Sequence, residues 1–126
     1  MYEYAAKVTK IVDGDTVDIE LDLGFHITIT QRCRLRGINC PETRGSQKEA
    51  GLSAKQYTQA WITATDNAVV IRSHKPYSDD KYGRFLVEIF PTKNASHIKI
   101  DAPTNAESLN NALLRTAMAI PYMVED

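Results

Sequence analysis

Apolar and polar residues alternate over an unusually long stretch in the first third of the chain. Between residues 17 and 35, nearly every odd position is apolar: Val17, Ile19, Leu21, Leu23, Phe25, Ile27, Ile29, Cys33 and Leu35. A period of two places alternate side chains on one face of a strand, so the pattern predicts antiparallel strands with one buried face. Gly24 interrupts the run and indicates a turn or strong bend between two strands.

Shorter patterns predict the remaining elements. Residues 3–12 are predicted to form a strand ending in a turn at Asp13-Gly14-Asp15, and residues 68–73 and 84–90 are predicted strands as well. A helix over 46–65 should start at a capping box, Ser46 to Glu49. Its apolar stripe at helical spacing consists of Ala50, Ala54, Tyr57, Trp61 and Ala64.

The C-terminal third is less regular. Residues 91–103 contain Pro91, Asn94 and Pro103 around a short candidate strand at 98–100, and they resemble an insertion. A second capping box at 104–107 predicts a helix that Pro121 should end. The apolar residues of that helix are Leu109, Ala112, Leu113, Ala117 and Ile120.

The order of elements predicts the fold. Three long strands, a helix, two strands and a second helix give a five-stranded barrel with a helix between its third and fourth strands. This is the OB-fold arrangement, which commonly binds oligonucleotides on its open face. The predicted class is α+β, mainly β, namely an OB-fold-like barrel with two or three helices. A chain of 126 residues is expected to form a single domain over 1–126.

Composition narrows the class of protein. With 43% hydrophobic and 25% charged residues, the chain is typical of a globular protein, and no apolar run approaches membrane-spanning length. The N-terminus shows no signal-peptide pattern, so a cytoplasmic protein with no membrane partner is expected. Cys33 and Cys40 are expected to be free thiols, and the three histidines provide no complementary pair for a zinc site.

Charge argues against a protein that coats nucleic acid by bulk electrostatics, because the formal net charge is −1. It leaves room for a local basic cleft. Basic residues that fall between positions 32 and 84 include Arg32, Arg34, Arg36, Arg44, Lys48, Lys75, Lys81 and Arg84.

The segment from 32 to 44 carries the most suggestive chemistry. Arg32, Arg34 and Arg36 alternate along a predicted strand and should share one face, while Glu42 follows just after the turn at Pro41. Cations beside a carboxylate suit phosphate chemistry. An edge strand protected by charge is an equally good explanation of this segment taken alone.

Three motifs in order carry a family resemblance. They are Asp13-Gly14-Asp15-Thr16, then Arg34-Leu35-Arg36-Gly37-Ile38-Asn39-Cys40-Pro41-Glu42, and finally Asp80-Lys81-Tyr82-Gly83-Arg84. In this order on a small barrel they resemble the staphylococcal (thermo)nuclease family. The ending Ala119-Ile120-Pro121-Tyr122 is closest in look to its short, phage-type members.

The resemblance implies a metal site. Asp15 would be a carboxylate ligand to calcium, and the backbone carbonyl of Cys40 would be another ligand. At the position where the family has a second carboxylate, this chain has Asn39. An amide oxygen can bind calcium but lacks the formal charge. The resemblance therefore predicts a weaker site, a higher calcium requirement or tolerance of another divalent ion.

The resemblance also implies catalytic and substrate-binding roles. Glu42 would orient or deprotonate the attacking water, directly or through the metal's hydration shell, and Arg34 and Arg84 would hold the scissile phosphate. The implied substrate-binding residues are Lys81, Tyr82 and Tyr122. Arg32 and Arg36 are better placed at the rim of a cleft. Three of these segments also have an ordinary structural explanation. Asp13-Gly14 is a common hairpin turn, Lys81-Tyr82 could lie in a solvated loop, and Tyr122 could cover the end of the barrel.

The predicted function is a metal-dependent, calcium-type nuclease that cleaves DNA and RNA with little sequence preference. Single strands should fit more easily than duplexes, and the family resemblance implies 3′-phosphate and 5′-hydroxyl ends. No obligate protein partner is evident. The alternative is a catalytically weakened nucleic-acid-binding module of OB type, in which Asn39 reflects loss of the metal. A protein-interaction module that retains only the fold has no positive feature in its favour.

Overall fold

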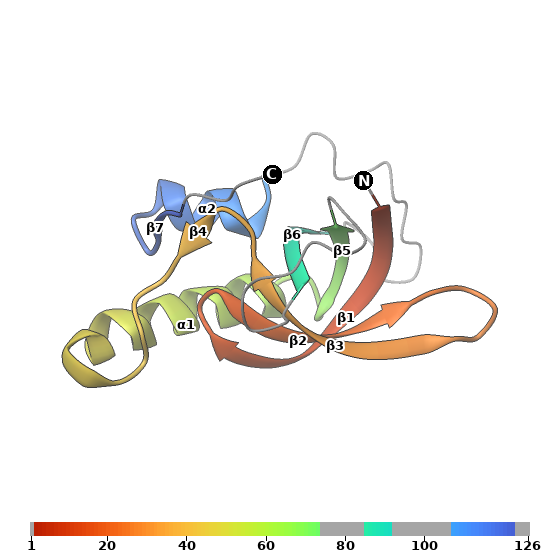
Figure 1. The fold of residues 1–126 in the computed structure, drawn as a ribbon, viewed down its shortest axis with the longest axis horizontal. Coiled ribbons are helices and arrows are strands. Elements are labelled where there is room, and N and C mark those ends of the chain that lie inside the picture. Colours follow the sequence, from red (N-terminus) through yellow and green to blue (C-terminus); the bar gives the residue numbers. More distant parts are fainter. Residues whose placement is uncertain (1, 74–84, 92–106, 123–126) are drawn as a thin grey trace.

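The computed structural model describes residues 2–73, 85–91 and 107–122 (Figure 1). Five strands close into a barrel in the order β1-β2-β3-β6-β5. Their bounds are β1 Tyr2–Asp13, β2 Thr16–Asp22, β3 Thr28–Leu35, β5 Ala68–Ser73 and β6 Phe85–Pro91. The remaining elements are the two-stranded sheet of β4 (Ile38–Asn39) and β7 (Ile120–Pro121), the 3₁₀ turn η1 (Gly45–Gln47), and the helices α1 (Lys48–Thr63) and α2 (Leu109–Arg115). The prediction of a mainly β, five-stranded, OB-fold-like barrel is confirmed.

The antiparallel pairing predicted within 17–35 is confirmed by β2 and β3, whereas the β3–β6 pairing differs from the rest of the barrel. All neighbouring strands run antiparallel except β3 and β6, which are parallel and pair Cys33 with Phe85 and Leu35 with Val87. The difference follows from the connection between them, because α1 and β5 reverse the chain twice before β6 begins. The crossover thus brings the end of β3 beside the start of β6.

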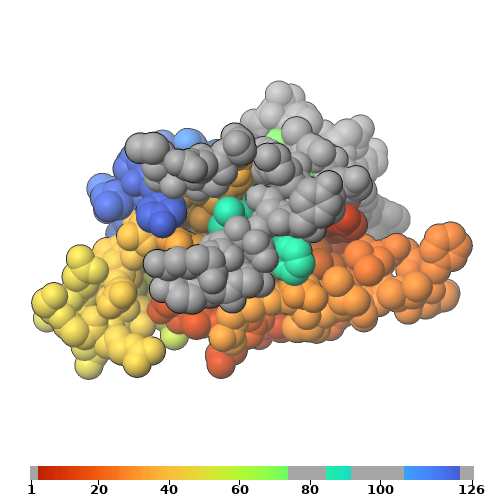
Figure 2. Space-filling view, in the orientation of Figure 1, coloured from red at the N-terminus to blue at the C-terminus, as the bar shows by residue number. Residues whose placement is uncertain are grey.

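The long alternation is buried only at its two ends. Val17, Ile19, Cys33 and Leu35 are at most 1% exposed and belong to the core. In the middle the prediction of a buried face is wrong, since Phe25 is 95% exposed and Ile27 is 52% exposed. Within β3, β6 pairs with the last three residues, Cys33–Leu35, so the β2–β3 hairpin extends past the barrel wall and protrudes at one end of the molecule (Figure 1, Figure 2).

The helix α1 begins later than predicted, and its predicted stripe is confirmed only in part: Ala54 is buried, and Tyr57 and Trp61 are partly buried and pack against the core. Ser46 lies in η1, Gln47 is the N-cap and makes no side-chain capping bond, so the predicted capping box is wrong. The buried residues of α1 are Gly51, Ala54, Thr58 and Ile62, whereas Ala50 and Ala64 of the predicted stripe are exposed. Three of the four buried residues are small, which lets the helix approach the neighbouring backbone closely.

The helix α2 is shorter than predicted at both ends. Its N-cap is Ser108, whose hydroxyl accepts a 3.0 Å hydrogen bond from the Asn111 N–H, so the box at 104–107 does not start it. Ala117 adopts a positive φ of 61°, and the N–H groups of Ala117 and Met118 bond to the carbonyls of Leu114 and Leu113. This Schellman closure ends the helix before Pro121, which lies in β7 instead.

Two further predictions cannot be compared with the fold. The candidate strand at 98–100 and nearly all of the segment 91–103 lie outside the described residues. In the part of the chain that is described, no helix is long and apolar enough to cross a membrane.

Candidate functional site

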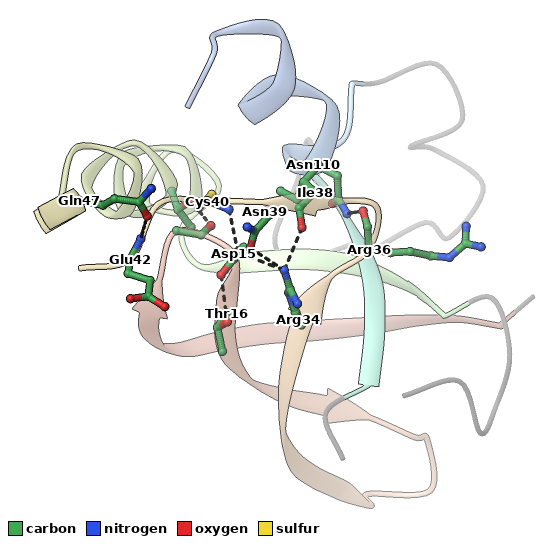
Figure 3. A network of polar contacts seen from close by, with 12 residues as sticks. Asp15, Thr16, Arg34, Arg36, Ile38, Asn39, Cys40, Glu42, Gln47 and Asn110 are labelled. Carbon is green, nitrogen blue, oxygen red and sulfur yellow. Dashed lines mark hydrogen bonds and ion pairs between the residues drawn. The ribbon is translucent and has the colours of Figure 1, made fainter. Parts of the chain in front are cut away.

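Asp15 lies in the tight turn between β1 and β2 and is only 7% exposed. Its Oδ2 accepts a 2.9 Å hydrogen bond from the backbone N–H of Cys40, and its Oδ1 accepts one of 3.1 Å from the Thr16 hydroxyl (Figure 3). Its backbone carbonyl accepts the N–H of Leu35 at 2.8 Å. This one residue therefore joins the first turn to the end of β3 and to the loop after β4.

Arg34 reaches the same place from β3, where it pairs with Thr16. Its side chain is 13% exposed, and its Nη2 donates to the Asn39 amide oxygen at 2.8 Å and to the Ile38 carbonyl at 3.3 Å. The same nitrogen lies 3.8 Å from Asp15 Oδ2 (Figure 3). The guanidinium is thus held by a carboxylate, an amide and a backbone carbonyl.

Tyr122 completes the surroundings of Arg34 from the other end of the chain. The centroid of its ring lies 4.8 Å from Arg34 Cζ, and its backbone N–H donates to the Gly37 carbonyl at 2.9 Å. The pairing of Ile38 with Pro121 and of Asn39 with Ile120 brings the C-terminal segment here. Five of the residues singled out in the sequence therefore gather in one network: Asp15, Arg34, Asn39, Cys40 and Tyr122.

Glu42 lies apart from this network. It is exposed, it sits in the loop after β4, and its backbone N–H is 3.4 Å from Gln47 Oε1. Figure 3 shows its carboxylate on the far side of Asp15 from Arg34. Within the described residues, no hydrogen bond or ion pair engages that carboxylate, which leaves it open to water.

Three of the predicted site residues lie outside the described part of the chain. These are Lys81, Tyr82 and Arg84. Their roles stay predictions. Phe85, the first described residue after this segment, pairs with Cys33, the neighbour of Arg34 in sequence.

The helix α1 supports the site loops through its small residues. The Thr58 hydroxyl donates a 2.7 Å hydrogen bond to the Gly14 carbonyl, and a Cβ on Gly14 would lie 2.9 Å from the Cβ of Ala54. One turn earlier, a Cβ on Gly51 would overlap the backbone carbonyl of Glu42. Gly51 and Thr58 were not predicted as supporting residues, although a glycine inside a predicted helix was a signal of close packing.

Asn110 is a second supporting residue that sequence reasoning missed. It is 5% exposed, its Nδ2 donates to the carbonyls of Arg36 and Val87 at 3.0 Å, and its Oδ1 accepts from the Ile89 N–H at 3.2 Å (Figure 3). It ties α2 to β6 and to the turn after β3. Nothing in the sequence distinguished it from its neighbour Asn111, which is exposed.

The other two arginines of the segment do not join the network around Asp15. Arg32 forms an ion pair with Asp18 across β2 and β3, with Nε 2.7 Å from Oδ1. Its hydrogen bond holds the pKa of Asp18 below the usual value. The Arg36 side chain points away from Arg34 in Figure 3. Neither residue shares the contacts of Arg34.

Neither cysteine is poised for chemistry through its thiol. Burial, together with the nearby Asp15 carboxylate, raises the pKa of Cys40 to about 12. Burial likewise raises the pKa of Cys33 to about 12. Both thiols are free and stay protonated near neutral pH, so they are poor nucleophiles and poor metal ligands there.

The oxygen atoms around Asp15 suit a hard cation in kind but provide little charge. The carboxylate of Asp15 and the amide of Asn39 are the ligand types that calcium prefers. Among the described residues, however, no group of three or more His, Cys, Asp or Glu side chains gathers to hold a metal. The donors near Asp15 therefore suit a divalent cation in kind. They offer it only one formal negative charge, that of Asp15, and the positive charge of Arg34 is close by.

Comparison with known proteins agrees with these motifs. An uncharacterized protein of Methanocaldococcus jannaschii, MJ1439, is 27% identical over 139 aligned residues, which cover 95% of this chain and 60% of that protein. The chain thus spans about three fifths of the relative's length. A family described as staphylococcal nuclease homologue matches residues 32–126, three quarters of the chain. The chain therefore belongs to the staphylococcal nuclease homologue family.

Proposed function

We propose that this protein is a metal-dependent phosphodiesterase of the calcium type that cleaves DNA and RNA with little sequence preference. Family membership indicates a nuclease or nucleic-acid-binding role. The observation that carries the proposal is the meeting of Arg34 and Asp15, with Nη2 3.8 Å from Oδ2, in a network supplied by three distant segments. Contacts to phosphates carry no sequence information, which supports low specificity.

Arg34 is suited to hold the scissile phosphate. Its hydrogen bonds and its ion pair with the described residues all use Nη2, which leaves the N–H groups on Nε and Nη1 for a phosphate oxygen. A fixed guanidinium stabilises charge that grows on the phosphate oxygens in the transition state. We assign the second cation to Arg84, as the family motif implies.

A divalent cation would be held by the Asp15 carboxylate, the Asn39 amide oxygen and the Cys40 carbonyl. When bound, it would supply positive charge that polarises the phosphate. With one carboxylate in this donor set, the affinity for calcium should be low.

Glu42 is assigned to the attacking water. Its exposed carboxylate can accept a proton from water as the water oxygen bonds to phosphorus. The bond from phosphorus to the 5′ oxygen then breaks, and that oxygen takes a proton from solvent. The products are a 3′-phosphate and a 5′-hydroxyl, and single strands should be the easier substrate.

Hydrolysis of a single-stranded oligonucleotide tests this assignment. Cleavage should require calcium or another divalent ion, stop with chelator, and fall at least about 100-fold in Glu42→Gln, as expected for loss of a general base. Glu20→Gln, which changes an exposed carboxylate on the barrel wall, is the matched control. Metal-stimulated cleavage that survives Glu42→Gln unchanged would refute the mechanism.

A non-catalytic nucleic-acid-binding barrel is the second candidate. It is favoured by one observation, namely that the Asn39 oxygen accepts a hydrogen bond from Arg34 and leaves Asp15 as the only carboxylate in the described network. Intact oligonucleotide binding without cleavage under any divalent ion would support this candidate over the enzyme.

A further inference from the structure

The C-terminal segment holds the backbone of Tyr122 in a fixed place beside Arg34. The strand β7 pairs with β4 through Ile38 and Asn39, and the Tyr122 N–H adds a 2.9 Å bond to the Gly37 carbonyl. These bonds continue the ladder on the segment that also holds Arg34 through Ile38 and Asn39. The Tyr122 ring and the hydrogen-bond acceptors of Arg34 therefore come from one hydrogen-bonded pair of segments.

The contacts of Arg34 restrain its guanidinium in different directions. The bonds from Nη2 to Asn39 and Ile38 fix one corner of the planar group, at 2.8 and 3.3 Å. Hydrogen bonds at one corner still allow the plane to tilt. Arg34 Cζ lies over the Tyr122 ring, 4.8 Å from its centroid, so the ring restricts movement of the guanidinium toward that side.

We propose that Tyr122 is a positioning residue, whose ring holds the Arg34 guanidinium in the orientation that grips a substrate phosphate. The inference rests on the proposed function for the role of Arg34 as the phosphate ligand. It assigns Tyr122 to the arginine rather than to a nucleotide. The hydroxyl of Tyr122 is then dispensable, while the aromatic ring is required.

Binding of a short single-stranded oligonucleotide in the presence of chelator separates these roles. Tyr122→Leu should weaken binding roughly 2- to 30-fold, the range expected for a lost cation–π contact. Tyr122→Phe should recover the wild-type affinity to within about twofold. Ile120→Ala, which changes a residue of β7 that is 64% exposed, controls for disturbance of the strand, and urea unfolding checks that each variant is folded.

The same substitutions in an Arg34→Met background test whether the effect passes through the arginine. Tyr122→Leu should then add less than about a twofold loss, because no guanidinium remains to be oriented. Two results would overturn the inference. The first is a loss of oligonucleotide affinity in Tyr122→Phe as large as in Tyr122→Leu, which would assign the hydroxyl to substrate. The second is an equal loss of affinity from Tyr122→Leu with and without Arg34.

A spectroscopic measurement is independent of nuclease activity and of substrate. The ring current of Tyr122 should shift the Arg34 side-chain protons upfield in the proton NMR spectrum of the wild type and of Tyr122→Phe, and the shift should vanish in Tyr122→Leu. Unshifted Arg34 protons in the wild type would contradict the inference even if the protein is an active nuclease. A protein that binds but never cleaves, with the shift present, would refute the proposed function alone.

Discussion

Asn39 has one amide oxygen and two candidate partners for it. In the structure this oxygen accepts a 2.8 Å hydrogen bond from Arg34, and in the proposed function it also binds the metal. Replacement of Asn39 by aspartate adds a formal charge beside Asp15. We expect Asn39→Asp to tighten calcium binding roughly tenfold, because ligand charge is a main determinant of calcium affinity.

Isothermal titration calorimetry with calcium measures this change directly. Asn39→Ala serves as the control and should bind calcium no better than the wild type. Unchanged calcium affinity in Asn39→Asp would show that position 39 is not a metal ligand and that the new carboxylate serves only Arg34.

The buried thiols of Cys33 and Cys40 predict a loss of stability in alkali. Burial raises both pKa values to about 12, from 9.0 for an exposed thiol. Above pH 9 the unfolded chain loses these protons while the folded chain keeps them, so rising pH favours unfolding until the folded pKa is reached. At pH 10 each thiol should lower the free energy of unfolding by about 1 kcal/mol.

Urea unfolding at pH 7 and pH 10 measures this loss. Tyrosine and lysine side chains also titrate near pH 10, so the quantity to compare is the pH-dependent loss in the wild type and in Cys33→Ala/Cys40→Ala. The double variant should lose about 2 kcal/mol less than the wild type over this range. Equal losses in the two proteins would show that the thiols ionise as readily in the folded state.

At the scale of elements, α1 acts as a support whose small residues set the positions of two site loops. A Cβ on Gly51 would overlap the Glu42 carbonyl, and alanine there cannot fit unless the loop moves. We expect Gly51→Ala to lower the free energy of unfolding by roughly 1–3 kcal/mol through overpacking, although alanine favours a helix by about 1 kcal/mol.

Chemical denaturation measures the stability of Gly51→Ala against Ser53→Ala, an exposed position on the same helix. The control should match the wild type or exceed it slightly. Cleavage activity should also fall in Gly51→Ala if Glu42 is the base, since its loop is displaced. If Gly51→Ala is as stable as the control, then α1 and the loop that carries Glu42 can move apart without loss in the free energy of unfolding.

The strands and helices together show how far periodicity predicts this fold. Alternation and helical spacing predicted every barrel strand and both helices, because these patterns reflect which faces are buried. They did not predict where burial stops along the β2–β3 hairpin, since that depends on how much of β3 the distant strand β6 covers. The predicted stripe on α1 was right for Ala54, Tyr57 and Trp61 but omitted Gly51 and Thr58, which are buried by close packing rather than by hydrophobicity.

At the scale of the whole molecule, the site is assembled from segments that are far apart in sequence. The motifs predicted Asp15, Arg34, Asn39 and Cys40, which the structure brings together, and the ending motif pointed to Tyr122. The supporting residues were not predictable in this way. Thr58 bonds to a residue 44 positions away and Asn110 to one 74 positions away, and no local pattern encodes such a contact.

The charge distribution of the molecule predicts how oligonucleotide binding depends on salt. The net charge is −1, and Arg32 on the barrel wall is paired with Asp18, so we expect phosphate contacts to be confined to the few cations around Arg34. With about two or three phosphate contacts, log K should fall with log salt at a slope of about −1.4 to −2. Fluorescence anisotropy of a labelled single strand in chelator measures this slope.

Arg34→Met should make the slope shallower by about 0.7, since one phosphate contact disappears. Arg115→Gln removes an arginine that is paired with Glu107 on the surface, and it should leave the slope unchanged. The comparison separates a localised phosphate grip from general electrostatic attraction. A wild-type slope steeper than about −4, changed equally by the two variants, would mean that nucleic acid spreads over the whole surface rather than binding at Arg34.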